Sequence, residues 1–167
     1  IGIVDLTVLD TGSCNNLINL NLAGNPLGEN ITDLPNLNCR LSLQTLSLSQ
    51  CGLKYDSLKN ILRAPYPSIT SLVLSNNTLG IGSAELLAHT PHFPSLSRLA
   101  LMHTHTPWSE LKQLVCARPL TFLDMRRNLG VCPRALRKAL DESEYEGMEI
   151  LPTPQMPSPP RATFSYK

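Results

Sequence analysis

The sequence predicts an α/β fold: a right-handed solenoid, one segment of a horseshoe, with a parallel concave sheet and helices or loops on its convex side. Two observations predict this class. Leucines return in a fixed pattern about every 26 residues along the chain. Aromatic residues make up only 5% of the 167 residues, so aliphatic side chains must fill the core. A core of this kind suits a stack of similar layers, in which each layer contacts only its neighbours.

The repeat is most regular from Leu17 to Leu27, where leucine takes the first, fourth, sixth and eleventh places and Asn25 takes the ninth. Two further copies fill these five places with Leu43, Leu46, Leu48, Cys51 and Leu53, and with Ile69, Leu72, Leu74, Asn77 and Leu79. Two less regular copies carry Leu96, Leu99, Leu101 and Thr104, and Leu120, Leu123, Met125 and Asn128. Partial copies at the two ends carry Ile1, Val4 and Leu6, and Tyr145, Met148 and Ile150.

Each copy predicts a short strand, because alternate side chains of a strand point to opposite faces of its sheet. Leu46 and Leu48 should therefore face the core, while Thr45 and Ser47 face outward. The ninth place should supply a side-chain hydrogen bond to the turning backbone, which would otherwise be buried unpaired. Cys51 is accordingly expected to be a reduced, inward-facing structural residue.

Helices are expected between most of the strands, because apolar residues return there at helical spacing. In the clearest case Ser83 can cap a helix whose Leu86 and Leu87 face inward. We expect Leu72, Leu74 and Leu86 to share one continuous core. The expected helical ranges are 56–64, 83–88, 107–117 and 133–140. Segment 28–40 contains Pro35 and few inward-facing positions, so it predicts a loop or a single turn.

This pattern resembles the leucine-rich-repeat family, whose ninth place accepts Asn or Cys, and the resemblance covers residues 1–151. Copies of about 26 residues with a helix opposite the strand are similar to the ribonuclease-inhibitor-like branch. Residues 77–87 are the clearest match to that branch. Cys51 is similar to the cysteine-containing branch, known from F-box substrate receptors, and one cysteine does not decide between the two. The resemblance implies a protein-binding role, because members of the family overwhelmingly bind proteins.

Two regions are expected along the chain. Residues 1–151 form the leucine-rich-repeat domain, with about five clear and two partial repeats, and the strand-like start at Ile1 predicts that an N-terminal part is missing. Residues 152–167 form a Pro-rich extended tail, because five prolines between 151 and 160 cannot join a sheet or helix. The tail is either a linker or a segment laid along a partner, with Phe164 and Tyr166 as anchors.

The sequence contains no motif that predicts an enzyme or a cofactor. It has neither a Gly-x-Ser-x-Gly nucleophile elbow nor a phosphate-binding loop, and Gly80-Ile81-Gly82 is too short to indicate a nucleotide site. The histidines form two pairs, His89 with His92 and His103 with His105. A zinc site needs three or four converging ligands, and these pairs lie on different segments, so we expect no metal.

Charge and cysteine usage restrict the partners and the compartment. Lys plus Arg number 14 against 13 Asp plus Glu, which argues against nucleic acid as a partner outside a ribonucleoprotein assembly. No apolar run reaches the length of about 18 residues that a membrane span needs. The five scattered cysteines favour reduced thiols and an intracellular protein, cytoplasmic or cytoskeletal. Glycosylation sequons at Asn30 and Asn76 keep an extracellular location open, and an organellar one also stays open.

The outward positions of the strands change in character along the chain. In the first copies they are small or uncharged, as at Asn19, Ser47 and Ser71. In the last copies they hold the mixture of Arg, Met and aromatic residues that protein interfaces favour. These candidate partner-binding residues are Arg98, Met102, His103, Phe122, Asp124, Arg126 and Arg127. The arginines alone fit ordinary solvated charges equally well, and Phe122 favours a binding patch.

The leading functional prediction is a non-catalytic protein–protein interaction module, a scaffold or structural subunit of a larger assembly such as a ciliary, cytoskeletal or ribonucleoprotein complex. Its protein partner is expected on the concave face, with the Pro-rich tail as a second contact. Two alternatives stay open: a regulator of an enzyme, such as a ubiquitin-ligase substrate receptor or a Ran-type GTPase activator, and an extracellular recognition domain. The sequence alone selects neither alternative.

Overall fold

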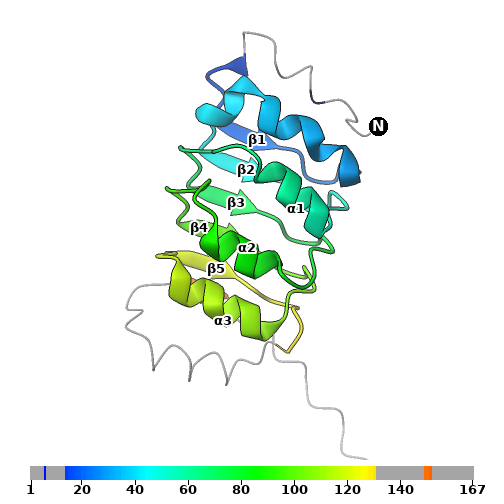
Figure 1. Ribbon diagram of the computed structural model, residues 1–167, viewed down its shortest axis with the longest axis vertical. Helices are drawn as coiled ribbons and strands as arrows, with labels where there is room; N and C mark the ends of the chain where they lie inside the picture. The colour runs from blue at the N-terminus through cyan, green and yellow to red at the C-terminus, as the bar shows by residue number, and fades with distance from the viewer. Residues whose placement is uncertain (1–5, 7–13, 131–148, 152–167) are drawn as a thin grey trace, which may run out of the picture.

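The computed structural model describes Leu6, residues 14–130 and residues 149–151 (Figure 1). Most of the first partial copy, the helix expected at 133–140 and the Pro-rich tail lie outside the described residues. Leu6, the described residue of the first copy, is fully buried, as its place in the repeat predicts.

The described strands form one parallel sheet of six strands in chain order. They are β1 (Asn19–Asn21), β2 (Thr45–Ser47), β3 (Ser71–Val73), β4 (Arg98–Ala100), β5 (Phe122–Asp124) and β6 (Glu149–Leu151). The register aligns the central residue of each strand with that of the next, from Leu20 beside Leu46 to Leu123 beside Ile150. The strand positions predicted from the leucines are therefore confirmed for β1 to β5. The last partial copy does form a strand, but its predicted register was wrong by two residues, because Leu123 pairs with Ile150 and not with Met148.

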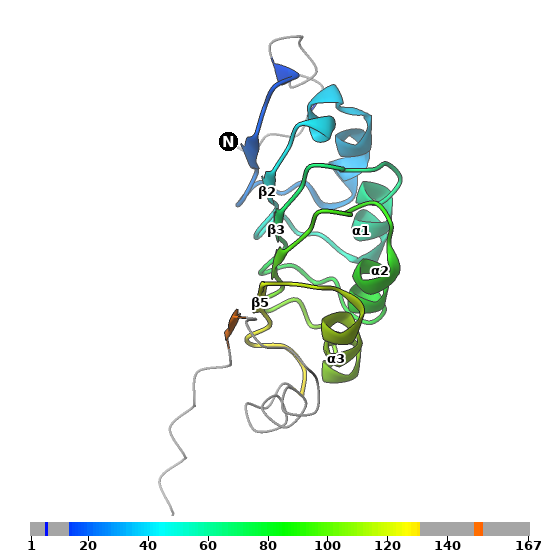
Figure 2. The ribbon, with the colours of Figure 1, turned by 90° about the vertical axis from the view of Figure 1, so that its left-hand side faces the viewer.

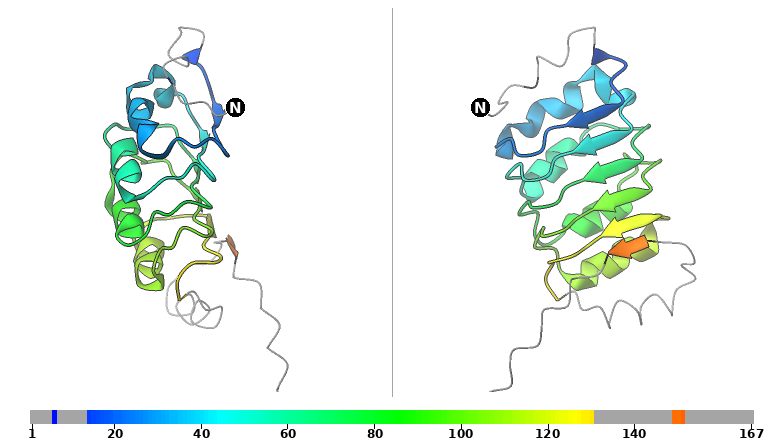
Figure 3. Two further views of the ribbon diagram at one scale, coloured as in Figure 1. Left: turned by 90° about the vertical axis from the view of Figure 1, so that its right-hand side faces the viewer. Right: turned by 180° about the vertical axis from the view of Figure 1, so that it is seen from behind.

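All the described helices cover one face of the sheet, and the other face is free of them (Figures 2 and 3). We call the uncovered side the open face. The α-helices are α1 (Tyr55–Ile61), α2 (Ser83–His89) and α3 (Trp108–Ala117), close to three of the predicted ranges. Segment 28–41 forms two 3-10 helices, η3 (Gly28–Asn36) and η4 (Asn38–Leu41), where a loop or single turn was expected. The fold is α/β with a parallel sheet, as predicted.

The core lies between the sheet and the helices and is built mainly from leucine. Leu72 and Leu74 are buried as predicted, with exposed fractions of 1% and 0%. Leu86 is only half-buried, contrary to the prediction, while Leu87 and Ala84 of the same helix are buried. The prediction for Leu86 was wrong because α2 packs more closely on α3 than on α1, so its side toward α1 is left partly uncovered.

The start of α2 also differs from the prediction. Ser83 was expected to cap the helix, but it is the first helical residue and is buried. The preceding residue, Gly82, takes the left-handed conformation with a φ of 85°. Its backbone N–H donates a hydrogen bond to Glu110 Oε1 of α3 at 2.8 Å. The serine hydroxyl instead donates to the carbonyl of Gly80 at 2.7 Å.

The ninth places of the repeat hold neighbouring coils together. Asn77 Oδ1 accepts the backbone N–H groups of Cys51 and Leu53, each at 3.0 Å. Asn77 Nδ2 donates to the carbonyls of Leu48 and Leu74, each at 2.8 Å. Both ends of one carboxamide thus satisfy buried backbone groups of its own coil and of the preceding one.

Cys51 has the structural place that the sequence predicts. Its side chain is fully buried, and its Sγ lies 3.1 Å from the carbonyl oxygen of Leu22 in the preceding coil. Burial raises the pKa of the thiol above its ordinary value. Cys116, the exposed cysteine of α3, is also a free thiol.

Each of the strands β1 to β5 is followed by a residue in the left-handed conformation, at which the chain turns toward the helical side. The φ angles are 77° at Gly24, 55° at Gln50, 57° at Asn76, 54° at His103 and 58° at Arg127. The N–H of Asn76 donates to the carbonyl of Met102 at 2.8 Å, and the equivalent groups at 24, 50 and 103 bond to the next coil in the same way. The turns are therefore stacked in register, like the strands.

Candidate functional site

The register places the outward residues of the open face in columns that cross the strands. One column runs from Thr45 through Ser71 and Arg98 to Phe122. The next column contains Val73, Ala100 and Asp124, and the positions after the strands hold Met102 and His103 on one coil and Arg126 and Arg127 on the next. All seven predicted site residues thus belong to the β4 and β5 coils, whose strands are neighbours.

Arg98 and Phe122 form the first contact within this group. The guanidinium carbon of Arg98 lies 4.5 Å from the centre of the Phe122 ring, in a cation–π arrangement. Arg98 is exposed, and the ring of Phe122 is half-buried. The outward place of Phe122 in the repeat predicts a ring that faces water. The structure corrects this, because the arginine on the neighbouring strand lies over the ring.

The Arg98–Phe122 pair borders a hollow in the open face. The hollow has a volume of about 260 Å³ and is lined on β3, β4 and β5 by Ser71, Leu72, Val73, Arg98, Leu99, Ala100 and Phe122. The surface is recessed at this point because the short side chains of Ser71 and Ala100 lie next to the large ring of Phe122. A depression of this size can receive one apolar side chain from another molecule, with the arginine at its edge.

Asp124 and Arg126 form the second contact. Arg126 Nε and Nη2 lie 2.9 and 2.7 Å from the two carboxylate oxygens of Asp124. The side chain of Asp124 is 8% exposed, whereas that of Arg126 is 33% exposed. The sequence prediction counted both as surface groups for a partner, but Asp124 is buried under its own arginine.

The remaining predicted residues lie at the carboxyl ends of the strands. Met102 is half-buried, and its N–H donates to Ser75 Oγ at 3.2 Å. His103 and Arg127 are exposed and share the left-handed turn position. The predicted residues therefore form two contact pairs on the strands and a looser group along the turns, and they do not make one compact cluster.

The described side chains of β1 to β5 and their turns give this part of the open face an excess of positive charge. Asp124 is the only carboxylate among their outward residues, and Arg126 neutralises it. Glu149 of β6 is the next residue of the column that contains Phe122. Arg98 and Arg127 are then exposed cations without an ion-pair partner among the described residues. A ligand for this surface should bring negative charge together with an apolar group.

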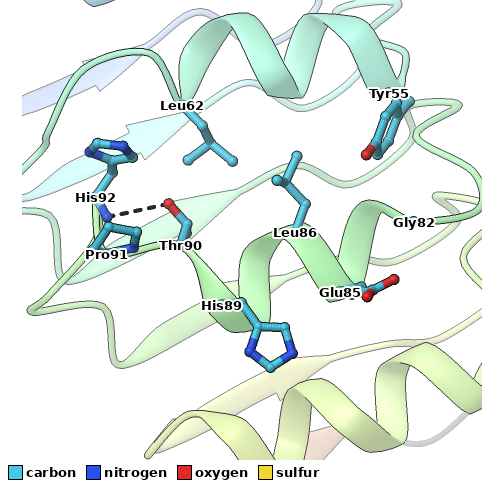
Figure 4. A pocket seen from close by; sticks show the side chains of 9 residues that line it. All are labelled: Tyr55, Leu62, Gly82, Glu85, Leu86, His89, Thr90, Pro91 and His92. Atoms are coloured by element: carbon cyan, nitrogen blue, oxygen red, sulfur yellow. Dashed lines mark hydrogen bonds between the residues drawn. The ribbon is translucent and has the colours of Figure 1, made fainter.

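A second hollow lies on the helical side, between α1 and α2, with a volume of about 540 Å³. Figure 4 shows Leu62 and Leu86 pointing toward each other across this gap, with Tyr55 at one end. His89 and His92 lie apart from each other there. No group of three or more His, Cys, Asp or Glu that could hold a metal ion occurs within the described ranges.

One feature of the site was not predicted from the sequence. The hollow depends on the short side chain of Ala100, which the repeat identifies only as one of the outward residues. His103 and His105, which the sequence already groups as a pair, lie with their ring centres 5.2 Å apart. His105 aligns with Gly52, two places after the left-handed residue that follows the strand.

None of the described helices has the length and apolar character needed to span a membrane. Comparison with known proteins yields no match: no protein-family model fits this sequence, and no curated protein is significantly similar to it.

Proposed function

We propose that the protein is a leucine-rich-repeat module without catalytic activity, and that it binds another protein on the open face as part of a larger assembly. The family assignment rests on the leucine places and on the ninth-place hydrogen bonds, with Asn77 as the most complete example. The sheet in chain order, with all described helices on one side, is the arrangement expected of such repeats.

The hollow beside Phe122 is the observation that carries the functional proposal. An apolar depression with an arginine over an aromatic ring is the kind of site where a few residues supply most of the binding energy of an interface. The small residues around it, such as Ser71 and Ala100, allow a partner backbone to come close to the sheet. The surrounding positions would then act as complementary contacts.

The chemistry of the surface indicates the partner's chemistry. Arg98 and Arg127 are exposed, and an arginine can pair with a carboxylate through two parallel hydrogen bonds. The partner should therefore present an aliphatic or aromatic side chain for the hollow, with Asp or Glu on either side of it. The affinity of such a complex should fall as salt concentration rises, because exposed ion pairs are screened.

Partner capture with single-residue variants tests this proposal. The tagged chain is incubated with extract of its native tissue, and the captured proteins are quantified by mass spectrometry. Arg98→Glu and Phe122→Ala should each lower capture of the specific partner by roughly tenfold or more. Arg63→Glu and Ile81→Ala are matched controls, because Arg63 is exposed near the end of α1 and Ile81 is 78% exposed before α2.

One result of the capture experiment would contradict the proposal for the open face. If Arg98→Glu and Phe122→Ala capture the same proteins at wild-type amounts while Arg63→Glu loses them, the binding face is the helical side. The proposal for the open face is then wrong. Circular dichroism of each variant ensures that the loss of binding does not come from unfolding.

A further inference from the structure

The turn after β4 differs from the other turns in one respect. It contains two left-handed residues that are not glycine, His103 with a φ of 54° and His105 with a φ of 60°, on either side of Thr104. The left-handed conformation costs an ordinary residue about 1–2 kcal/mol, and glycine takes it without that penalty. The first position is left-handed in every described copy, but the equivalent of His105 after β2 is Gly52.

Buried hydrogen bonds fix the backbone next to both histidines. The N–H groups of Thr104 and Thr106 donate to Asn128 Oδ1 at 3.0 and 3.1 Å. The two threonine hydroxyls lie 2.9 Å apart, and both residues are fully buried. His105 lies between these two threonines and His103 directly precedes Thr104. Both histidines are exposed, so both imidazoles lie at the surface on the same turn.

The two imidazoles border a polar hollow of about 470 Å³ at the carboxyl ends of the strands. The ring centres of His103 and His105 are 5.2 Å apart, with an angle of 43° between the planes. The rest of the lining is polar or small: Gln50, Gly52, Asn76, Asn77 and Thr78. None of these lining residues is a carboxylate, which disfavours Ca²⁺ and Mg²⁺ as ligands of the hollow.

The separation of the rings fits a shared metal ion. With metal–nitrogen bonds of about 2.0 Å, two imidazoles on one tetrahedral ion have ring centres about 5 Å apart. Imidazole is a preferred ligand for Zn²⁺, Ni²⁺ and Cu²⁺. We propose that His103 and His105 form a two-histidine site for a divalent transition-metal ion, with water in the remaining coordination positions. This site does not depend on the protein partner proposed above.

Two substitutions test the site with little disturbance of the turn. His103→Asn and His105→Gly each introduce the residue that the chain itself uses at an equivalent left-handed position, Asn76 or Gly52. His89→Gln and His92→Gln are the matched controls, because these histidines line the other hollow. Every sample carries Cys116→Ser and Cys132→Ser, so that thiolates do not compete for the ion, and the affinity tag is removed.

Binding of Ni²⁺ is measured by isothermal titration calorimetry, together with the melting temperature of each variant. The parent protein and the two controls should bind one Ni²⁺ per chain. His103→Asn and His105→Gly should weaken this binding by roughly tenfold or more. His105→Gly should also melt at the same temperature as the parent or higher, because glycine relieves the left-handed conformation.

Three results would overturn the site. The first is absence of Ni²⁺ binding by the parent protein, and the second is parent-like affinity in His103→Asn and His105→Gly. The third is loss of binding in His89→Gln or His92→Gln, which would move the site to the helical side. Since the titration contains no protein partner, these outcomes leave the proposal for the open face untouched.

Discussion

Arg126 grips the carboxylate of Asp124 through two parallel hydrogen bonds of 2.9 and 2.7 Å, and its backbone N–H also donates to the same carboxylate at 3.2 Å. These hydrogen bonds to Asp124 raise the pKa of Arg126, because they stabilise the charged guanidinium. Arg126 therefore stabilises the fold, by pairing with a buried carboxylate, in addition to being a residue of the open face. Among the described residues of β4, β5 and their turns, Arg98 and Arg127 are the arginines without an ion-pair partner.

We predict that Arg126→Ala lowers the free energy of unfolding by about 1–2 kcal/mol, because it leaves the carboxylate of Asp124 buried without its cation. The estimate is moderate because the guanidinium is 33% exposed and solvent screens the pair. Urea unfolding of Arg126→Ala, Asp124→Asn and the double variant measures the coupling. If the effects of the single changes simply add in the double variant, the two residues do not stabilise each other.

Leu74→Ala should cost about 2–5 kcal/mol of unfolding free energy, because it opens a cavity in the fully buried centre of the stack. Leu86→Ala removes the same atoms from a half-buried position and should cost about 1 kcal/mol. Chemical denaturation of the two variants gives both values. Equal losses would contradict the described packing of α2.

The thiol of Cys51 should react with a labelling reagent only after the protein is denatured, because it is fully buried and burial raises its pKa. Cys116 is exposed on α3 and should react quickly in the native protein. Mass spectrometry of peptides after a short labelling pulse separates the two sites. Native-state labelling of Cys51 as fast as that of Cys116 would rule out the inward-facing position.

Tyr66 should make the protein less stable in alkali. Burial raises the pKa of its hydroxyl above the ordinary value of 10.0, so above that pH the folded state keeps a proton that the unfolded chain releases. The free energy of unfolding must then fall as pH rises beyond 10. Tyr66→Phe should remove this part of the slope, which urea unfolding at a series of pH values measures.

The same substitution has an expected effect at neutral pH. The hydroxyl of Tyr66 is buried and has no hydrogen-bond partner among the described residues. Tyr66→Phe should therefore raise the unfolding free energy by about 1 kcal/mol at pH 7, while keeping the ring contact with Phe93 at 5.3 Å between centres. A large loss of stability at pH 7 would mean that the hydroxyl is bonded in solution.

Strands β1 to β5 could be predicted from the sequence, because leucines such as Leu46 and Leu48 alternate with outward residues and allow only one register. The last copy lacks such leucines, and its predicted register was wrong by two residues. The ninth places could be predicted for a similar reason, since a buried turn must satisfy its backbone groups and Asn77 has the required donors and acceptors. In both cases a local requirement, either burial of a strand face or hydrogen bonding of a buried turn, determines the residue type.

The errors arose where the outcome depends on distances between elements. Leu86 and Leu87 are adjacent, and only the wider separation of α2 from α1 decides that Leu86 is the less buried one. Serine is a residue type that often caps helices, but here the left-handed Gly82 is the N-cap and Ser83 is the first residue of the helix. Asp124 occupies an outward position of β5, but it is buried because the side chain of Arg126 covers it.

The sequence could predict which residues belong to the site, but it could not predict their contacts or the hollow between them. The pattern could place Phe122 and Arg98 on the open face, because outward positions alternate with the leucines. The stacking of that pair and the hollow beside it depend on side-chain conformations across three strands. The sequence could group His103 with His105, but the separation of their rings depends on two backbone angles that no periodicity encodes.

Photo-crosslinking at two aromatic positions tests the central claim most directly. In one variant the photo-reactive analogue p-benzoylphenylalanine replaces Phe122 on the open face, and in the other it replaces Tyr55 on the helical side, which is also half-buried. After irradiation in native extract, the account predicts a discrete protein adduct at position 122 and none at position 55. An adduct at position 55 alone would contradict it, because the partner would then lie on the helices.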